Sequence, residues 1–80
     1  MEQLIVLQKE IANCNQLIYY YTMREQEVYN DYQTGELTDI NIVNEKVLDF
    51  QYLQRHYQSL IDEKEVEIIK IRGICIAFSE

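Results

Sequence analysis

The chain has 80 residues, which limits it to one small domain. Seven Lys and Arg against fourteen Asp and Glu give a net charge of -7, so the chain lacks the clustered cations that binding to nucleic acid requires. It has no Pro, only two Gly and a hydrophobic fraction of 48%. This composition argues against a loop-rich or β-rich domain, which needs turn residues, and against a disordered chain, which is poor in apolar residues.

Two long segments without Gly or Pro, 2–33 and 40–72, flank a single break over residues 34–39. Gly35 suits the left-handed position that ends a helix, and Thr38 or Asp39 suits the N-cap of the next helix. We therefore predict an all-α fold with a helix over 2–33, a turn over 34–38 and a helix over 39–76. The two helices form one helical-hairpin domain over residues 1–80.

Both segments carry hydrophobic residues at the heptad spacing of a coiled coil. The columns of the first segment are Leu4, Ile11, Ile18, Glu25 and Tyr32, and Leu7, Cys14, Tyr21 and Val28. The columns of the second segment are Ile40, Val47, Gln54, Ile61, Ile68 and Cys75, and Val43, Phe50, Tyr57, Lys64, Ile71 and Phe78. The polar breaks are Glu25, Gln54 and Lys64. This period predicts two long helices packed antiparallel.

The turn fixes which residues of the two helices face each other. If it centres near Glu36, Val28 lies near Val43. Glu25 then lies near Lys46, and we expect a weak surface ion pair between them. Residues beyond about Ile71 have no counterpart in the first helix and form an apolar overhang.

Further apolar residues widen the hydrophobic stripe of each helix beyond the seam of a hairpin. They are Leu17 in the first helix and Leu53, Leu60 and Ile74 in the second. Two helices cover only a narrow seam on each other, so a wider stripe implies a third or fourth helix. We predict that the chain forms a homodimer, most simply a two-fold four-helix bundle, or binds another protein.

Tyrosines and the overhang supply the candidate contact residues. The chain has seven tyrosines, and Tyr19, Tyr20 and Tyr21 are consecutive, so they cannot all face one core. Tyr is favoured at interfaces because it buries area and keeps a polar tip. We assign the partner contacts to Tyr19, Tyr20, Leu53, Leu60, Ile74, Ile76 and Phe78.

Catalysis and metal binding have little support in the sequence. His56 is the only histidine, and no HExxH or CxxC pattern accompanies it. Cys14 and Cys75 both occupy heptad core positions at distant levels of the hairpin, so we expect no disulfide between them. We predict no catalytic residues, no cofactor and no metal, and we predict that the protein is not an enzyme.

The acidic run 62–67 is either a solvated helix face or a functional patch. We predict a non-catalytic helical interaction module that acts as an adaptor, co-chaperone or regulator. The alternative is an acidic inhibitor that mimics nucleic acid on a DNA- or RNA-binding protein. The apolar runs 4–7 and 74–78 are too short to span a membrane, and residues 1–4 have no basic stretch of a secretory signal. We therefore expect a cytoplasmic location.

Val47-Leu48-Asp49 is similar to the end of a Ser-Gln-x-Leu-Asp signature. Small helical-hairpin phosphatases of sporulation response regulators carry this signature on their second helix. Glu45 and Lys46 stand at the Ser and Gln positions, so no activity is carried over. The predicted shape also resembles the small hairpin chaperones of bacterial secretion systems, which wrap an aggregation-prone partner; this is a likeness of architecture alone.

Overall fold

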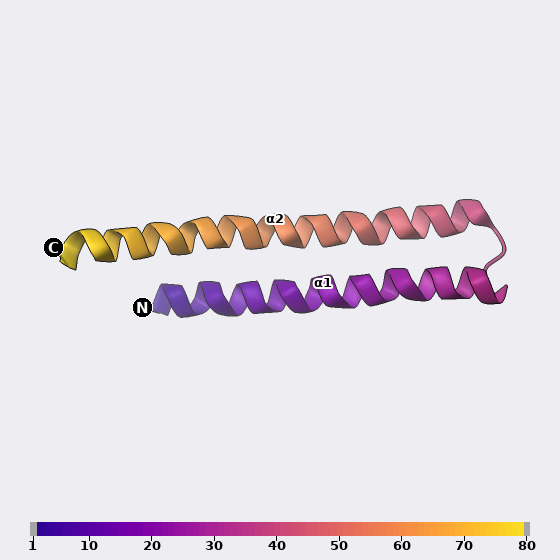
Figure 1. Cartoon of the computed structure of the whole chain (residues 1–80), viewed down its shortest axis with the longest axis horizontal. Coiled ribbons are helices and arrows are strands. Elements are labelled where there is room, and N and C mark those ends of the chain that lie inside the picture. The colour runs from indigo at the N-terminus through magenta and orange to yellow at the C-terminus, as the bar shows by residue number, and fades with distance from the viewer. Residues whose placement is uncertain (1, 80) are drawn as a thin grey trace.

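The computed structural model describes the backbone of residues 2–79 and the side chains of residues 2–73. Helix α1 spans Glu2–Thr34 and helix α2 spans Ile40–Ser79. The two helices run antiparallel, and α2 extends past the N-terminal end of α1 (Figure 1). The rod measures 64 × 16 × 13 Å. The prediction of an all-α helical hairpin is confirmed.

The turn closes α1 with hydrogen bonds that use its free carbonyl groups. Gly35 has φ 85°, and its N–H donates to the Tyr32 carbonyl oxygen at 3.3 Å. The Leu37 N–H donates to the Asp31 carbonyl oxygen at 3.1 Å. Only Gly adopts this left-handed conformation without strain from a Cβ, which is why the helix ends at this point.

Of the two N-cap candidates, Asp39 immediately precedes α2 and caps it. Its Oδ1 accepts a hydrogen bond of 2.9 Å from the Asn41 N–H, and its carbonyl oxygen accepts the first helical bond from Val43. Helix α2 thus begins at Ile40 and not at residue 39. It also continues through Gly73 to Ser79 and so extends beyond the predicted end at residue 76.

The core is a thin seam between the helices. Its buried side chains are Leu7, Cys14, Val28, Val43, Val47 and Ile61, and none of the described side chains falls below 2% exposure. All six belong to the predicted heptad columns. Ile40 was expected there too but is 47% exposed. Leu37 takes its place, because the chain crosses between the helices there and packs Leu37 against Val28, Val43 and Val47.

The register differs from the turn-centred expectation by about two residues at the open end. Lys64 donates a hydrogen bond to Glu10, whereas a turn centred at Glu36 would put Asp62 opposite Glu10. Near the turn, Val28 contacts Val43 as predicted. An offset of two residues is about 3 Å along the axis, which a Lys side chain can reach across.

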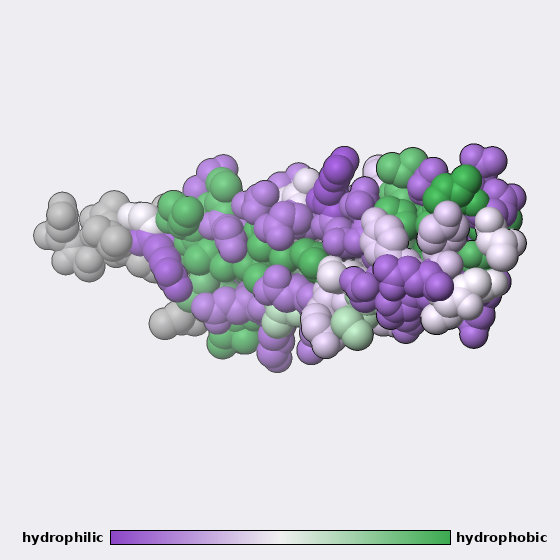
Figure 2. All heavy atoms as spheres, turned by 45° about the vertical axis from the view of Figure 1, so that its right-hand side comes forward, coloured by the Kyte–Doolittle hydropathy of each residue, from purple (hydrophilic) through white to green (hydrophobic). Residues whose placement is uncertain are grey.

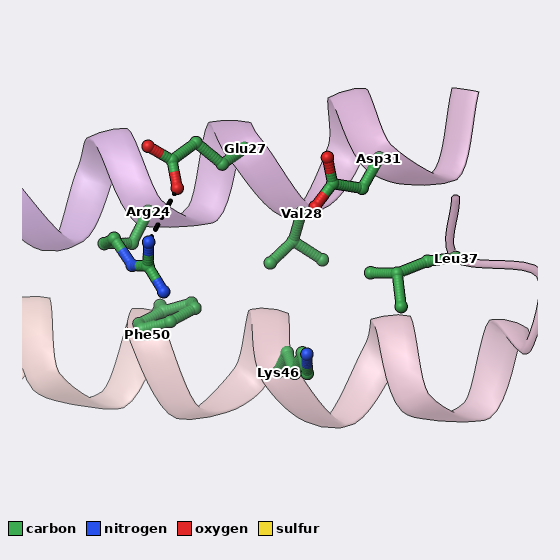
Figure 3. A pocket seen from close by; sticks show the side chains of 7 residues that line it. All are labelled: Arg24, Glu27, Val28, Asp31, Leu37, Lys46 and Phe50. Carbon is green, nitrogen blue, oxygen red and sulfur yellow. Dashed lines mark hydrogen bonds and ion pairs between the residues drawn. The ribbon is translucent and has the colours of Figure 1, made fainter. Parts of the chain in front are cut away.

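The predicted ion pair between Glu25 and Lys46 is wrong. Among the described residues, ion pairs join Arg24 to Glu27 and Lys64 to Glu10. Glu25 is half-buried in the seam, and its Oε1 is buried without a hydrogen-bond partner. Lys46 instead lines a hollow beside Arg24 (Figure 3). The pair does not form because the Glu25 carboxylate lies in the seam, whereas Lys46 lines the hollow beside it.

Neither helix, within the part of the chain that the structure describes, contains a stretch that is both long and apolar enough to cross a membrane.

Candidate protein interface

A hollow of about 260 Å³ near the turn defines one side of the seam, which we call the hollow side. Arg24, Glu27 and Asp31 enter it from α1, and Lys46 and Phe50 enter it from α2 (Figure 3). Arg24 Nη1 donates to Glu27 Oε2 at 2.8 Å. The shared hollow shows which flank of α1 meets which flank of α2.

The hollow side extends toward the open end of the hairpin along residues that are spaced by seven on each helix. Seven residues before Arg24 is Leu17, and seven and fourteen after Lys46 are Leu53 and Leu60. In packed helices a spacing of seven keeps residues on the same flank of the seam. The Glu10–Lys64 ion pair lies on the same side, because Glu10 is seven residues before Leu17.

The middle of the hollow side is apolar, and we call it the central face. It consists of Leu17, Tyr20, Leu53, Tyr57 and Leu60. Tyr20 is 54% exposed, and the other four side chains are half-buried. A partner could therefore bury further apolar area at each of the five positions.

Aromatic rings connect the central face to both helices. The Tyr21 ring stacks on Tyr57 at 6.0 Å and on Phe50 at 6.1 Å, and it meets Tyr20 edge-on at 5.2 Å. His56 continues the series, since its ring lies 5.2 Å from Tyr57. Rings held by neighbouring rings lose little side-chain entropy on binding, which makes them good anchors at an interface.

The other side of the seam is polar, and we call it the amide side. Its flanking residues include Gln8, Asn15, Gln51 and Gln58. Thr22 belongs to the same column as Asn15, and its Oγ1 lies 3.3 Å from Gln54 Oε1. Figure 2, a view of one side of the hairpin, shows a narrow hydrophobic band bordered by hydrophilic rows over the half away from the turn.

The structure brings together three of the seven predicted contact residues. Tyr20, Leu53 and Leu60 lie on the central face. Tyr19 is 68% exposed, but it is one residue before Tyr20 and so points about 100° away from it around α1. Ile74, Ile76 and Phe78 lie outside the residues whose side chains the structure describes, as does Cys75.

Two members of the central face were missing from the predicted set. Leu17 lies at its centre and Tyr57 joins it to the aromatic rings. The spacing of seven from Leu17 to Arg24, and from Leu53 to Lys46, is visible in the sequence. The sequence does not show which flank of α1 lies beside which flank of α2.

Charged groups surround the central face at both ends. The Glu10 carboxylate accepts a hydrogen bond from Lys64 and raises the pKa of the Lys64 ammonium above its ordinary value of 10.5; burial opposes this shift. His56 lies between aromatic rings, with the Tyr52 ring 6.4 Å away on its other side. Among the described residues, no cluster of three His, Cys, Asp or Glu is placed to hold a metal ion.

Comparison with protein-family models, curated proteins and solved structures finds no match to this chain. The fold defines a two-helix antiparallel hairpin with an apolar, aromatic central face.

Proposed function

We propose that the chain is a non-catalytic helical interaction module that binds protein, a second copy or a different chain, through its central face. The observation that carries the proposal is the meeting of Leu17, Tyr20 and Leu60 from two helices on one half-exposed surface. The roles that fit such a surface are those of an adaptor, co-chaperone or regulator. A four-helix, coiled-coil-like bundle is the simplest assembly that covers it.

The accessible area supports this proposal. The chain exposes 6309 Å², whereas a compact monomer of its 9.7 kDa mass exposes about 5,100 Å². The excess of about 1,200 Å² exceeds the area of roughly 800 Å² that one partner buries in a standard protein interface. A rod with a thin seam thus exposes more surface than a compact monomer, and the central face is an apolar part of that surface that a partner would remove from water.

Neighbouring tyrosines provide a matched test. We would place a photo-crosslinking amino acid at Tyr20 in one variant and at Tyr19 in another, in cells of the native host. The two positions differ by one residue and both are exposed, at 54% and 68%, but only Tyr20 lies on the central face. We expect a protein adduct at position 20 and little at position 19. Equal adducts at both positions, or none at either, would refute the proposal.

The adduct also separates the kinds of partner, since mass spectrometry identifies it as a second copy or a different protein. A salt titration of the purified complex then tests the acidic-mimic alternative. Apolar docking changes little with salt, whereas binding of a basic protein by mimicry of nucleic acid weakens steeply as salt rises.

A further inference from the structure

The charges around the central face are arranged by sign. Arg24 of α1 and Lys46 of α2 lie on its turn side, and both line the hollow. Glu10 of α1 and Glu67 of α2 lie on its open side. All four belong to the two columns that contain Leu17, Leu53 and Leu60. Along these columns, the charges that directly flank the central face are therefore positive toward the turn and negative toward the open end, and Asp31, one heptad nearer the turn, is the exception.

The columns share one centre of symmetry. The Tyr21 ring stacks on both Phe50 and Tyr57, so Tyr21 lies about level with the residues midway between them, and Leu17, four residues farther from the turn, lies about level with Tyr57. Tyr57 is close to the midpoint between Leu53 and Leu60. At a rise of 1.5 Å per residue, Arg24 and Glu10 each lie about 10 Å from this centre.

The same centre relates the charges of α2. Lys46 and Glu67 are equally far from the midpoint between Leu53 and Leu60, at about 16 Å on either side. A two-fold axis at this level, perpendicular to the helices, exchanges the positive and the negative end of the face. It therefore places each cation of one copy opposite an anion of the other.

We propose that the occupant of the central face is a second copy of this chain, seated head to tail, so that each α1 packs on α1 and each α2 packs on α2 of the second copy. This inference rests on the proposed function and specifies its partner. Leu17 meets its own symmetry mate, and Leu53 meets Leu60 of the second copy. Arg24 faces Glu10 of the second copy, and Lys46 faces Glu67 of the second copy.

The ion pairs within each chain extend this pattern. Arg24 already pairs with Glu27, and Glu10 already pairs with Lys64. The head-to-tail dimer joins them into a row of alternating sign that runs from Glu27 through Arg24 to Glu10 and Lys64 of the second copy. Alternating charges in one row reinforce each other, and networks contribute more than isolated surface pairs.

The other two-fold arrangement, with both turns at the same end, packs α1 on α2 of the second copy. It places Glu10 near Glu67 of the second copy, three residues along the axis, and Arg24 near Lys46 of the second copy, four residues along, while Lys46 also comes within three residues of Asp31. Like charges this close oppose association. The rival arrangement thus sets two like-charge contacts against one opposite-charge contact, whereas head to tail both contacts join opposite charges, so the charge pattern favours the head-to-tail arrangement.

Charge-reversal variants test the arrangement. The mass of each variant in solution is measured by light scattering after size exclusion, over a concentration series at low salt. The variants are Lys46→Glu, Glu67→Lys and the double variant that carries both. Glu65→Lys is the matched control, because Glu65 lies on the same helix in the column of Gln51 and Gln58 on the amide side. All of these positions are exposed, and circular dichroism verifies that each variant keeps its helices.

We expect wild type and Glu65→Lys to form dimers. Each single reversal alters two symmetry-related contacts, so it raises the dissociation constant by about tenfold or more. The double variant dimerises again, and an equimolar mixture of the two single variants forms heterodimers because their charges are complementary. The head-to-tail arrangement would be overturned if neither single reversal weakened the dimer. It would also be overturned if dimerisation returned neither in the double variant nor in the mixture of the two single variants.

A wild-type mass of one chain at every concentration would overturn the second copy as occupant. That result leaves the proposed function standing if the probe at Tyr20 still captures a different protein. Failure of the proposed function is distinct, since it requires that the Tyr20 probe gives no adduct or gives no more than the Tyr19 probe.

Discussion

Ile61 and Ile69 offer a direct measure of how much the seam between α1 and α2 stabilises the hairpin. Both lie in α2, but Ile61 is 3% exposed and Ile69 is 68% exposed. Replacement by Ala removes three carbons, which is worth about 2.4 kcal/mol at the buried site and about 0.8 kcal/mol at the exposed one. Ala also favours the helix by about 0.4 kcal/mol at both positions. We therefore expect Ile61→Ala to lower the free energy of unfolding by about 2 kcal/mol and Ile69→Ala by about 0.4 kcal/mol.

Urea unfolding followed by circular dichroism at 222 nm measures the difference, with all proteins at one concentration so that association contributes equally. With a slope of about 1 kcal/mol per molar urea for a chain of this size, Ile61→Ala lowers the midpoint by about 2 M. The midpoint of Ile69→Ala falls by less than about 0.5 M on the same scale. Similar shifts in both variants would refute the seam, because helix propensity and side-chain chemistry are matched and only burial differs.

Further predictions concern the two glycines, the N-cap of α2 and the ion pair at the open end. Gly35→Ala should lower the free energy of unfolding by about 1 kcal/mol, because Ala is strained at φ 85° although the space around it is open. Gly73→Ala should instead raise the helix content measured by circular dichroism, because Gly73 is helical and a Cβ there meets nothing. Asp39→Ala removes the N-cap bond to α2 and should cost about 1 kcal/mol in urea unfolding; no loss would show that this cap does not stabilise the helix. The pKa of Lys64 is raised in the folded chain, so its ion pair with Glu10 contributes fully below pH 10.5 and less as the pH rises through the folded value. The difference in unfolding free energy between wild type and Glu10→Gln should therefore shrink above pH 10.5. A difference that stays constant contradicts this pairing.

Local chemistry made most of the fold predictable. The break at Gly35 follows from the backbone freedom of Gly, and the start of α2 follows from an Asp that can bond the next free N–H groups. The buried positions Leu7, Cys14 and Val47 follow from the heptad period. These features depend on residues within one or two turns of helix, so a single sequence contains them.

The errors arose where two distant segments meet. Ile40 has the heptad position of a core residue, but Leu37 fills the space because the path of the turn brings it over the seam. Glu25 and Lys46 are close in level, but Glu25 turns into the seam whereas Lys46 lines the hollow beside it. Level along the axis can be estimated from the turn, whereas the side of the seam depends on how each helix is rotated about its own axis.

The sequence by itself determined two long helices, the break between them, and the columns of Leu17, Leu53 and Leu60. Only the tertiary structure decided that these columns share one side of the seam, that Tyr20 joins them and that Tyr19 does not. The physical reason is that a helix period fixes the angle between residues of one helix, while packing of the core fixes the rotation of one helix against the other. A surface formed by both helices exists only after that rotation is set.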